Sequence, residues 1–270
     1  MQQFHFIAGL PRSGSTLLAS ILNQNPAMSA GITGPAAGIF NAVQRSMSQG
    51  AEASGFLTHD HRRALLRHVI TDCHDDHKIV FDTNRSWPSK INILADLFPE
   101  CRMLCCVRSI SWIVDSIERL IRKNVYDLSG IFNFEAGHTV FDRAKSLTEG
   151  GLVGSANTAM MDAFYGDNAN RLLLIEFDAL TRHPGEVMRA VYNFLDLPMY
   201  EWHDFEKIEP IPGAAEFDQR MGTPGLHNLG RKIESRARET ILPPEVFNSF
   251  GQPFWRRGSP KGALVLQTQE

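Results

Sequence analysis

The sequence predicts an α/β fold in which helices cover both faces of a mainly parallel sheet. Short apolar runs rich in β-forming residues alternate with longer runs whose apolar residues recur at helical spacing. Their order along the chain, β-α-α-β-α-β-α-α-β-α, is typical of strands that helices connect into one parallel sheet. A chain of 270 residues with 43% hydrophobic and 21% charged residues has the composition of an ordinary globular protein.

Four segments are predicted as strands, at residues 3–9, 78–82, 101–107 and 171–177. The run at 101–107 is continuously apolar, which is expected of a strand buried on both faces. Helices are expected at residues 15–23, 35–47, 58–72, 86–98, 109–123, 155–165 and 184–195. Thr58 or Asp60 is expected to cap the third helix, and Ser86 the fourth, which has Pro88 in its first turn.

The organisation along the chain indicates one domain over residues 1–270. Residues 1–200 carry the alternating strand and helix pattern and form the expected α/β core. Residues 201–270 are dominated by Pro, Gly and charged residues and are expected to be irregular. The Gly-rich stretch 124–154 is interpreted as a loop with a short helix.

Charge and cysteine content limit the possible partners and setting. The net charge of −3 and the pI of about 6.4 argue against a general nucleic-acid binder, which would be basic, but are compatible with a local cationic pocket. The spacing of the four cysteines (Cys73, Cys101, Cys105 and Cys106) is not that of a disulfide framework, which favours a reducing, cytoplasmic location. We expect neither a signal peptide nor a membrane span, because apolar runs stay below the roughly 18 residues that a span requires.

The first predicted strand leads into a glycine-containing loop. Residues 9–16 read Gly-Leu-Pro-Arg-Ser-Gly-Ser-Thr, in which Gly9 and Gly14 have the spacing of the phosphate-binding motif G-x-x-x-x-G-K-[ST]. Such a loop turns backbone N–H groups and a helix N-terminus towards an anion, and Arg12 adds a side chain that can fork onto phosphate or sulfate oxygens. The sequence therefore predicts a P-loop-like fold with an anion site formed by Pro11, Arg12, Ser13, Gly14, Ser15 and Thr16.

The loop departs from the nucleotide-hydrolase motif at one position. Ser15 stands where that motif has the lysine that reaches the β- and γ-phosphates of a nucleoside triphosphate. This weakens the interpretation as a kinase and suits a donor with a single phosphate that bears a further group. A kinase with a modified loop and a non-catalytic nucleotide-binding module stay open as alternatives.

A second candidate anion site follows the third predicted strand. Arg108 ends that strand, and Ser116 lies eight residues further on, about two turns into the next helix. In open α/β sheets ligands bind beyond the carboxyl ends of the strands, where Arg108 is expected. The pattern is weak by itself and gains weight from the loop on the first strand.

The segment FIAGLPRSGSTLLASILNQNP resembles the 5'-phosphosulfate loop of sulfotransferases that use 3'-phosphoadenosine 5'-phosphosulfate (PAPS), especially the bacterial and tyrosylprotein-type branch. That family has an Arg and a Ser, at the spacing of Arg108 and Ser116, that bind the 3'-phosphate of the donor. Residues 171–198 are similar to the family's late strand–turn–helix segment. The resemblance covers residues 3–200.

The resemblance implies in-line transfer of a sulfuryl group from PAPS to an acceptor hydroxyl or amine, with release of adenosine 3',5'-bisphosphate (PAP). Arg12 and the loop N–H groups would stabilise the leaving phosphate, and no metal is required. The expected partners are the nucleotide donor and an acceptor that the sequence does not identify. Residues 201–270 are expected to cover the acceptor side. The oligomeric state, including a homo-oligomer, stays open.

The residue that serves as general base in the family has no counterpart in this sequence. Cytosolic members carry Lys-Thr-His after the second strand, with the histidine as base, where this sequence reads Asp82-Thr83-Asn84-Arg85. The tyrosylprotein branch uses a glutamate after the first helix, and the corresponding residues 29–34 include no carboxylate.

Asp82 is the leading candidate for the base, because it ends a predicted strand near the loop. An equally weighted hypothesis makes it a structural partner of Arg12 or Arg85. His59 is a weaker candidate.

Three further patterns are interpreted as mainly structural. Trp255-Arg256-Arg257-Gly258 is similar to the family's late basic segment that reaches the 3'-phosphate, with Arg231 and Lys232 as competing candidates, but solvated turns are favoured for both. Residues 222–227 (GTPGLH) are turn-rich and suit part of an acceptor lid. Cys73 and His77, with His68 nearby, lack the fuller ligand set that a zinc site requires.

Overall fold

A parallel sheet forms the centre of the molecule. The computed structural model describes residues 2–123, 126, 139–235 and 238–268. Within these ranges the sheet has six strands in the order β2-β3-β1-β4-β5-β6, and every neighbouring pair is parallel. The strands are β1 (Gln3–Gly9), β2 (Met28–Ala30), β3 (Ile79–Thr83), β4 (Met103–Val107), β5 (Leu172–Glu176) and β6 (Leu264–Leu266). The predicted α/β fold with a parallel sheet is confirmed.

The four predicted strands agree with β1, β3, β4 and β5, with ends that differ by two residues at most. The two strands that were not predicted, β2 and β6, have three residues each and form the edges of the sheet. Their alignment comes from β3 and β5, whose backbone groups pair with them. Within residues 201–270, which were expected to be irregular, β6 adds a strand to the sheet.

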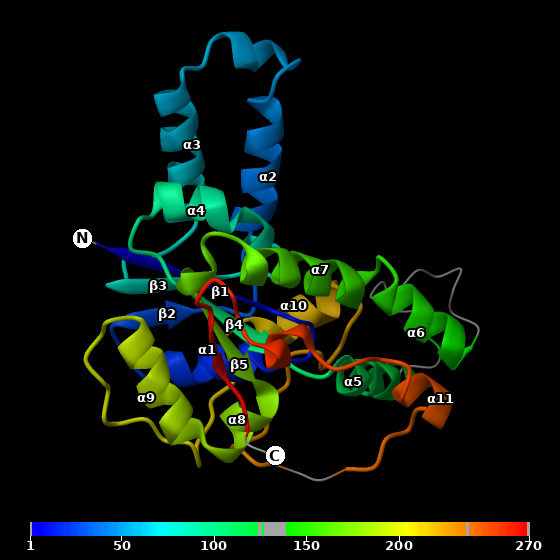
Figure 1. The fold of residues 1–270 in the computed structure, drawn as a ribbon. Helices are drawn as coiled ribbons and strands as arrows, with labels where there is room; N and C mark the ends of the chain where they lie inside the picture. Colours follow the sequence, from blue (N-terminus) through cyan, green and yellow to red (C-terminus); the bar gives the residue numbers. More distant parts are fainter. Residues whose placement is uncertain (1, 124–125, 127–138, 236–237, 269–270) are drawn as a thin grey trace.

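Helices cover both faces of the sheet, as Figure 1 shows. Adjacent strand residues point to opposite faces, so that Phe6 and Cys105 join one buried cluster and Ile7 and Cys106 the other. The first cluster packs under α2 (Ala36–Ser46), α4 (Ile91–Leu97) and α7 (Leu152–Tyr165). The second packs against α1 (Ser15–Leu22), α8 (Phe177–Arg182) and α9 (Pro184–Phe194). The result is the predicted three-layer α/β/α arrangement.

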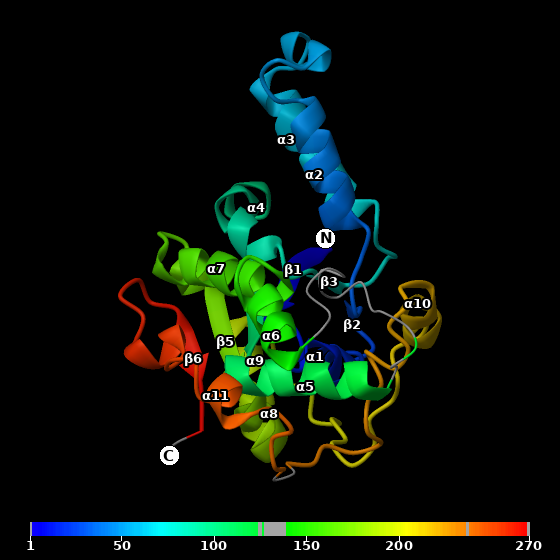
Figure 2. The ribbon, with the colours of Figure 1, turned by 90° about the vertical axis from the view of Figure 1, so that its right-hand side faces the viewer.

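A helical hairpin projects from this body. Helices α2 and α3 (His59–Thr71) run side by side away from the sheet, and a short 3-10 turn, η1 (Glu52–Gly55), lies between them at the tip (Figures 1 and 2). Thr58 caps α3, because its hydroxyl accepts a hydrogen bond from the backbone N–H of His61 at 3.2 Å. The expected cap at Thr58 is thereby confirmed.

The fourth predicted helix begins differently from the expectation. Ser86 occupies the N-cap position of a 3-10 turn, as expected, but its hydroxyl makes no capping hydrogen bond and donates to the side chain of Asn84 at 2.8 Å. The segment starts as a 3-10 turn, η2 (Trp87–Lys90), and continues as α4. Asn84 competes successfully for the serine hydroxyl, because a side chain two residues away closes a local turn at little entropic cost.

The remaining helices are α5 (Ile110–Lys123), which follows β4, α6 (Val140–Thr148), α10 (Ala214–Arg220) and α11 (Pro244–Phe247). Two further 3-10 turns are η4 (Ala169–Arg171), directly before β5, and η5 (Phe254–Arg257). Of the expected loop with a short helix at 124–154, the structure describes α6 and the start of α7, whereas 124–125 and 127–138 lie outside the described residues. Among the described helices, none has the length and apolar character that crossing a membrane requires.

Candidate functional site

Two glycines shape the loop between β1 and α1. Gly9 has φ 144°, and a Cβ atom there would lie 2.1 Å from the carbonyl oxygen of Cys106 on β4. Gly14 has φ 99° in the left-handed region and directly precedes α1. Because side chains are excluded at the first position and disfavoured at the second, the loop can bend tightly against β4 and still begin a helix.

The loop is fastened to the sheet through Ser13. Its buried hydroxyl lies 2.7 Å from the carbonyl oxygen of Cys106 and also contacts the carbonyl oxygen of Leu10. Of the predicted anion-binding residues, Ser13 therefore has only its backbone N–H to offer a ligand. Arg12, beside it, adopts φ 59°, an uncommon conformation for a residue with a side chain and one that concentrates at functional sites.

The first turn of α1 presents the anion-binding features of a helix N-terminus. The first intrahelical bond runs from Leu18 N–H to the Gly14 carbonyl at 2.9 Å, so the N–H groups of Ser15 and Thr16 have no helical partner. Both residues are half-buried, and no side-chain cap covers this end. The amides and the helix dipole thus favour a negative charge above the loop.

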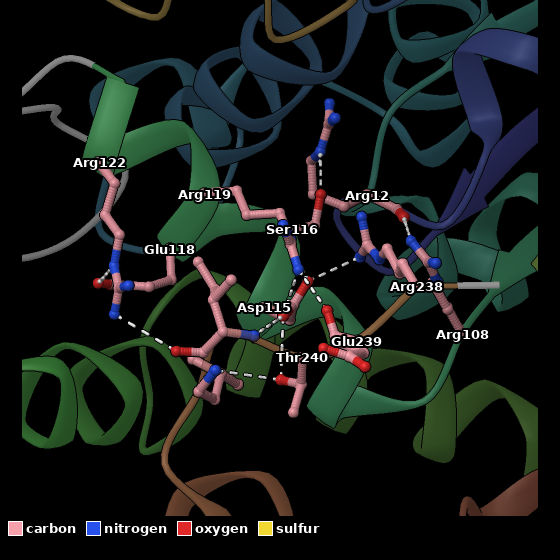
Figure 3. Close-up of polar contacts among 12 residues, drawn as sticks. Arg12, Arg108, Asp115, Ser116, Glu118, Arg119, Arg122, Arg238, Glu239 and Thr240 are labelled. Atoms are coloured by element: carbon pink, nitrogen blue, oxygen red, sulfur yellow. Dashed lines mark hydrogen bonds and ion pairs between the residues drawn. The ribbon is translucent and has the colours of Figure 1, made fainter. Parts of the chain in front are cut away.

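The side chain of Arg12 joins the loop to two distant segments. Its Nε donates to the hydroxyl of Ser116 on α5 at 3.1 Å (Figure 3). Its Nη1 donates to the carbonyl oxygen of Leu226. Burial lowers the pKa of Arg12, while nearby Asp218 raises it and Arg238 lowers it. The loop, α5 and the 222–227 segment therefore meet around one guanidinium group.

Arg108 approaches the same loop from the end of β4. Its Nη1 lies 3.5 Å from the carbonyl oxygen of Arg12, and its guanidinium carbon lies 4.1 Å from the ring centre of Phe177. Burial lowers its pKa to about 10, and the positive charges of Arg238 and Arg12 contribute to the decrease. Its buried Nε has no hydrogen-bond partner among the described residues. A buried donor of this kind is costly unless a ligand satisfies it.

Arg238 adds a third guanidinium group that sequence reasoning missed. It lies 2.9 Å from the buried carboxylate of Asp115 and 5.2 Å from the ring centre of Trp112. Burial by itself raises the pKa of Asp115, but hydrogen bonds from Arg119, Ile241 N–H and Thr240 hold it below its usual value. Asp115 thereby ties the 238–241 segment to α5, next to Ser116 (Figure 3).

Of the predicted site residues, Arg12, Ser116 and Arg108 thus come together in one place, where positive charge is in excess. The charge of Arg238 lowers the pKa of both Arg12 and Arg108, and the charge of Arg12 also lowers the pKa of Arg108. Asp115 is held by Arg119 as well as by Arg238, and Asp218 is engaged by His227. A bound polyanion would offset the repulsion among these positive charges.

Asp82 lies apart from this cluster, fully buried on β3. One carboxylate oxygen accepts a hydrogen bond from the indole N–H of Trp87 at 2.6 Å, and the other lies 2.8 Å from Nε2 of His74. No hydrogen bond or ion pair among the described residues joins it to Arg12 or Arg85. These contacts favour a structural role, with Trp87 and His74 as the partners in place of the arginines.

The other candidates from the sequence have specific places too. The Trp255 indole N–H and the Arg256 guanidinium both bind the carboxylate of Glu176, at 2.7 and 3.1 Å, which fixes η5 on the end of β5. Arg257, Arg231 and Lys232 are exposed, and His59 is exposed on the projecting hairpin. Within the described residues, no group of three or more His, Cys, Asp or Glu side chains is placed to hold a metal ion.

Comparison with known proteins gives one match by sequence. A sequence model described as the Sulfotransferase family matches residues 5–204. No curated protein matches the chain.

Several solved structures are similar in fold. A sulfotransferase from Alicyclobacillus acidocaldarius is 15% identical, with a TM-score of 0.49 over 82% of this chain and 92% of that one. The sulfotransferase domain of the Synechococcus olefin synthase is 17% identical, with a TM-score of 0.48 over 93% and 90%. A mouse sulfotransferase in complex with PAP is 12% identical, with a TM-score of 0.49 over 95% and 80%.

Proposed function

Because this chain belongs to the sulfotransferase family, we propose that it transfers a sulfuryl group from PAPS to an acceptor hydroxyl or amine. The observation that carries the proposal is the meeting of the 9–16 loop with Arg12, Ser116 and Arg108 at the carboxyl ends of β1 and β4. The family match and this geometry both favour a nucleotide donor that carries negative charge at two ends.

The 5' end of the donor is assigned to the loop. The backbone N–H groups of residues 13–16 and the start of α1 would hold the 5'-phosphate, with Pro11 fixing the bend before Arg12. Arg12 would donate its remaining N–H groups to the bridging or terminal oxygens, where negative charge develops as the sulfuryl group leaves. These contacts would act by positioning and by charge stabilisation.

The 3'-phosphate is assigned to Arg108, Ser116 and Arg238. The buried Nε of Arg108 is a donor that such a phosphate would satisfy, and Ser116 already contacts Arg12 at 3.1 Å. Arg238 extends this set from the C-terminal segment, where Asp115 holds it at 2.9 Å. Three guanidinium groups suit a ligand with a second phosphate, because charge-assisted bonds to phosphate oxygens are strong and directional.

One contact supports the expectation that the C-terminal segment covers the acceptor side of the site. The backbone of residues 222–227 lies against Arg12 through the Leu226 carbonyl, on the loop that would hold the sulfuryl group. An acceptor that approaches the sulfur from outside the loop would meet this segment. We therefore extend the proposal to residues 222–227 as part of the acceptor pocket.

Ligand-dependent stability and sulfuryl transfer test the proposal together. PAP without Mg²⁺ is expected to raise the melting temperature, because a ligand that binds the folded state stabilises it, whereas ATP with Mg²⁺ is expected to change it little. Radiolabelled sulfate should pass from PAPS to at least one member of a panel of phenols, alcohols, sugars and amines. Stabilisation by ATP with Mg²⁺ and none by PAP would favour the kinase alternative. PAP binding without transfer would favour the non-catalytic module.

A further inference from the structure

The reaction proposed above needs a proton acceptor, and a histidine–aspartate pair lies beside the loop. Asp218, on α10, is fully buried, and its Oδ1 contacts Nδ1 of His227. Its Oδ2 accepts a hydrogen bond from the backbone N–H of His227 at 2.8 Å. One carboxylate therefore fixes both the main chain and the ring of the histidine.

The fold of the 221–228 turn brings the pair together. Gly222 and Gly225 have φ values of 66° and 79°, in the left-handed region that glycine adopts without strain. The Thr223 N–H donates to the Asp218 carbonyl at 2.9 Å, and the Leu226 N–H to the Thr223 carbonyl at 3.0 Å. The chain thus folds back on the end of α10 and delivers His227 to Asp218.

The contact with the carboxylate sets the state of the ring. A carboxylate accepts hydrogen bonds, so Nδ1 of His227 carries the proton, and in the neutral ring Nε2 keeps its lone pair. Within the described part of the chain, Nε2 has no hydrogen-bond partner. The side chain is 17% exposed, so the ring is not sealed from solvent.

The pair also lies next to the group assigned to the sulfuryl donor. The carbonyl oxygen of the Leu226–His227 peptide accepts a hydrogen bond from Nη1 of Arg12. The charge of Asp218 acts on Arg12, whose pKa it raises. Among the described residues, the charged group in contact with the His227 ring is Asp218 from α10, while Arg12 from the loop contacts the preceding peptide, and the ring of Phe217 packs edge-on at 5.9 Å.

We infer that His227 is the general base of the transfer and that Asp218 is the residue that positions it. The inference rests on the proposed sulfotransferase function. Nε2 of His227 takes the proton of the acceptor hydroxyl while the acceptor oxygen bonds to the sulfur. The bond from sulfur to the bridging oxygen breaks, and its electron pair leaves with the 5'-phosphate of PAP. The imidazolium, paired with the Asp218 carboxylate, then releases its proton to solvent.

This assignment fills the position that the sequence motifs leave empty. Asn84 stands where cytosolic members of the family have their histidine, and Asp82 uses both oxygens on Trp87 and His74. His227 reaches the site from a segment far along the chain. A purely structural alternative exists, in which the pair only closes the turn at the end of α10, and the experiment must separate the two.

The test uses a variant that keeps the structural contact and removes the base. In His227→Asn the amide nitrogen occupies the position of Nδ1 and can still donate to Asp218, whereas no atom replaces Nε2. His61→Gln, at an exposed position on α3, is the matched control. The full chain is mixed with PAPS, with water and added phenol as acceptors, and PAP release is measured in a single turnover from pH 5 to 9. PAP affinity and melting temperature are measured in parallel.

The expected result is a loss of about 10²–10⁴-fold in PAP release for His227→Asn, with PAP affinity within about threefold of wild type. The acidic limb of the wild-type rate profile should vanish in this variant. Imidazole should partly restore the rate in His227→Ala, which a structural role does not explain. Asp218→Asn should also slow release, because the ring loses the acceptor that orients it.

Two outcomes would overturn the inference. One is a His227→Asn rate equal to wild type at unchanged PAP affinity. The other is a His227→Asn variant that keeps the acidic limb of the wild-type rate profile. A wild-type protein that does not bind PAP, or that binds it and transfers nothing, would instead remove the proposed function itself, so the two failures are distinguishable.

Discussion

The Nε atom of Arg12 donates to the hydroxyl of Ser116 at 3.1 Å, although 104 positions separate the two residues. Arg12 belongs to the loop after β1 and Ser116 to the helix after β4. Because β1 and β4 are adjacent and parallel, the two motifs meet at one edge of the sheet. The two segments that the sequence predicts to bind anions are therefore in contact in the folded chain.

Replacement of Arg108 should weaken binding of the 3'-phosphate selectively. We expect Arg108→Ala to lower PAP affinity by about 100-fold, equivalent to about 3 kcal/mol, because charge-assisted bonds to the phosphate are lost. Affinity for 5'-AMP, which has no 3'-phosphate, should change little. Isothermal titration of both nucleotides measures the difference. Arg257→Ala removes an exposed arginine and serves as control; an equal loss for both nucleotides would contradict the assignment.

We expect Arg238 to contribute to PAP affinity and Arg231 not to contribute. Arg238 is held beside the cluster by Asp115, whereas the side chain of Arg231 is exposed. We expect Arg238→Ala to lower PAP affinity by about 10- to 100-fold, with a weaker salt dependence, and Arg231→Ala to leave it unchanged. Titrations at two salt concentrations measure both effects. Equal behaviour of the two variants would exclude Arg238 from the site.

The bend of the loop depends on Gly9. In Gly9→Ala the new methyl group would overlap the Cys106 carbonyl at 2.1 Å, so we expect a loss of more than about 3 kcal/mol in the free energy of unfolding. Gly38→Ala is the matched control, because Gly38 lies inside α2 with no atom within 4 Å of the added carbon. There we expect a gain of about 0.5–1 kcal/mol. Urea unfolding measures both changes, and a neutral Gly9→Ala would contradict the close approach of the loop to β4.

Acid should destabilise the protein through His5. Burial, with the nearby charge of Arg102, lowers its pKa from 6.5 to about 4. Between these values the unfolded chain binds more protons than the folded one, so the free energy of unfolding should fall as the pH drops from about 6.5 to about 4. His5→Asn, whose amide oxygen can still accept the Arg102 N–H bonded at 3.1 Å, should flatten this dependence. Urea midpoints across this range give the comparison; parallel curves for the two proteins would contradict it.

Asp82 should matter for stability more than for transfer. Trp87→Phe leaves one Asp82 oxygen without its donor at 2.6 Å, and we expect a loss of about 1–3 kcal/mol in stability. Asp82→Asn should lower the melting temperature as well, while the folded fraction releases PAP within a few-fold of the wild-type rate. A loss of 100-fold or more in folded Asp82→Asn would restore Asp82 as the base.

The sequence predicted the interior of the fold well, because buried strands such as β4 are continuous apolar runs. Edge strands β2 and β6 were not predicted, because three residues are too few to show the alternation of apolar and polar side chains. Their alignment depends on a neighbouring strand. Ser86 makes no capping hydrogen bond with its side chain, and its hydroxyl donates to the side chain of Asn84.

The candidate site also contains residues that local sequence predicts and residues that it does not. Arg12 and the loop belong to a contiguous motif, and Arg108 and Ser116 share one strand and helix, so local spacing predicts them. Arg238 reaches the site through its contact with Asp115, a relation between distant segments that no spacing encodes. His227 was noted as part of a turn, but its pairing with Asp218 follows from left-handed glycines and a buried carboxylate.

We propose that the site around Arg12 and Arg108 binds both phosphate ends of the donor. Isothermal titration of PAP, 5'-AMP and 3'-AMP to the full chain without Mg²⁺ tests it most directly. We expect PAP to bind at least 100-fold more tightly than either monophosphate, because each of those engages only half of the site. If 5'-AMP bound as tightly as PAP, the arginines at the end of β4 and in the C-terminal segment would hold no phosphate, and the account would be contradicted.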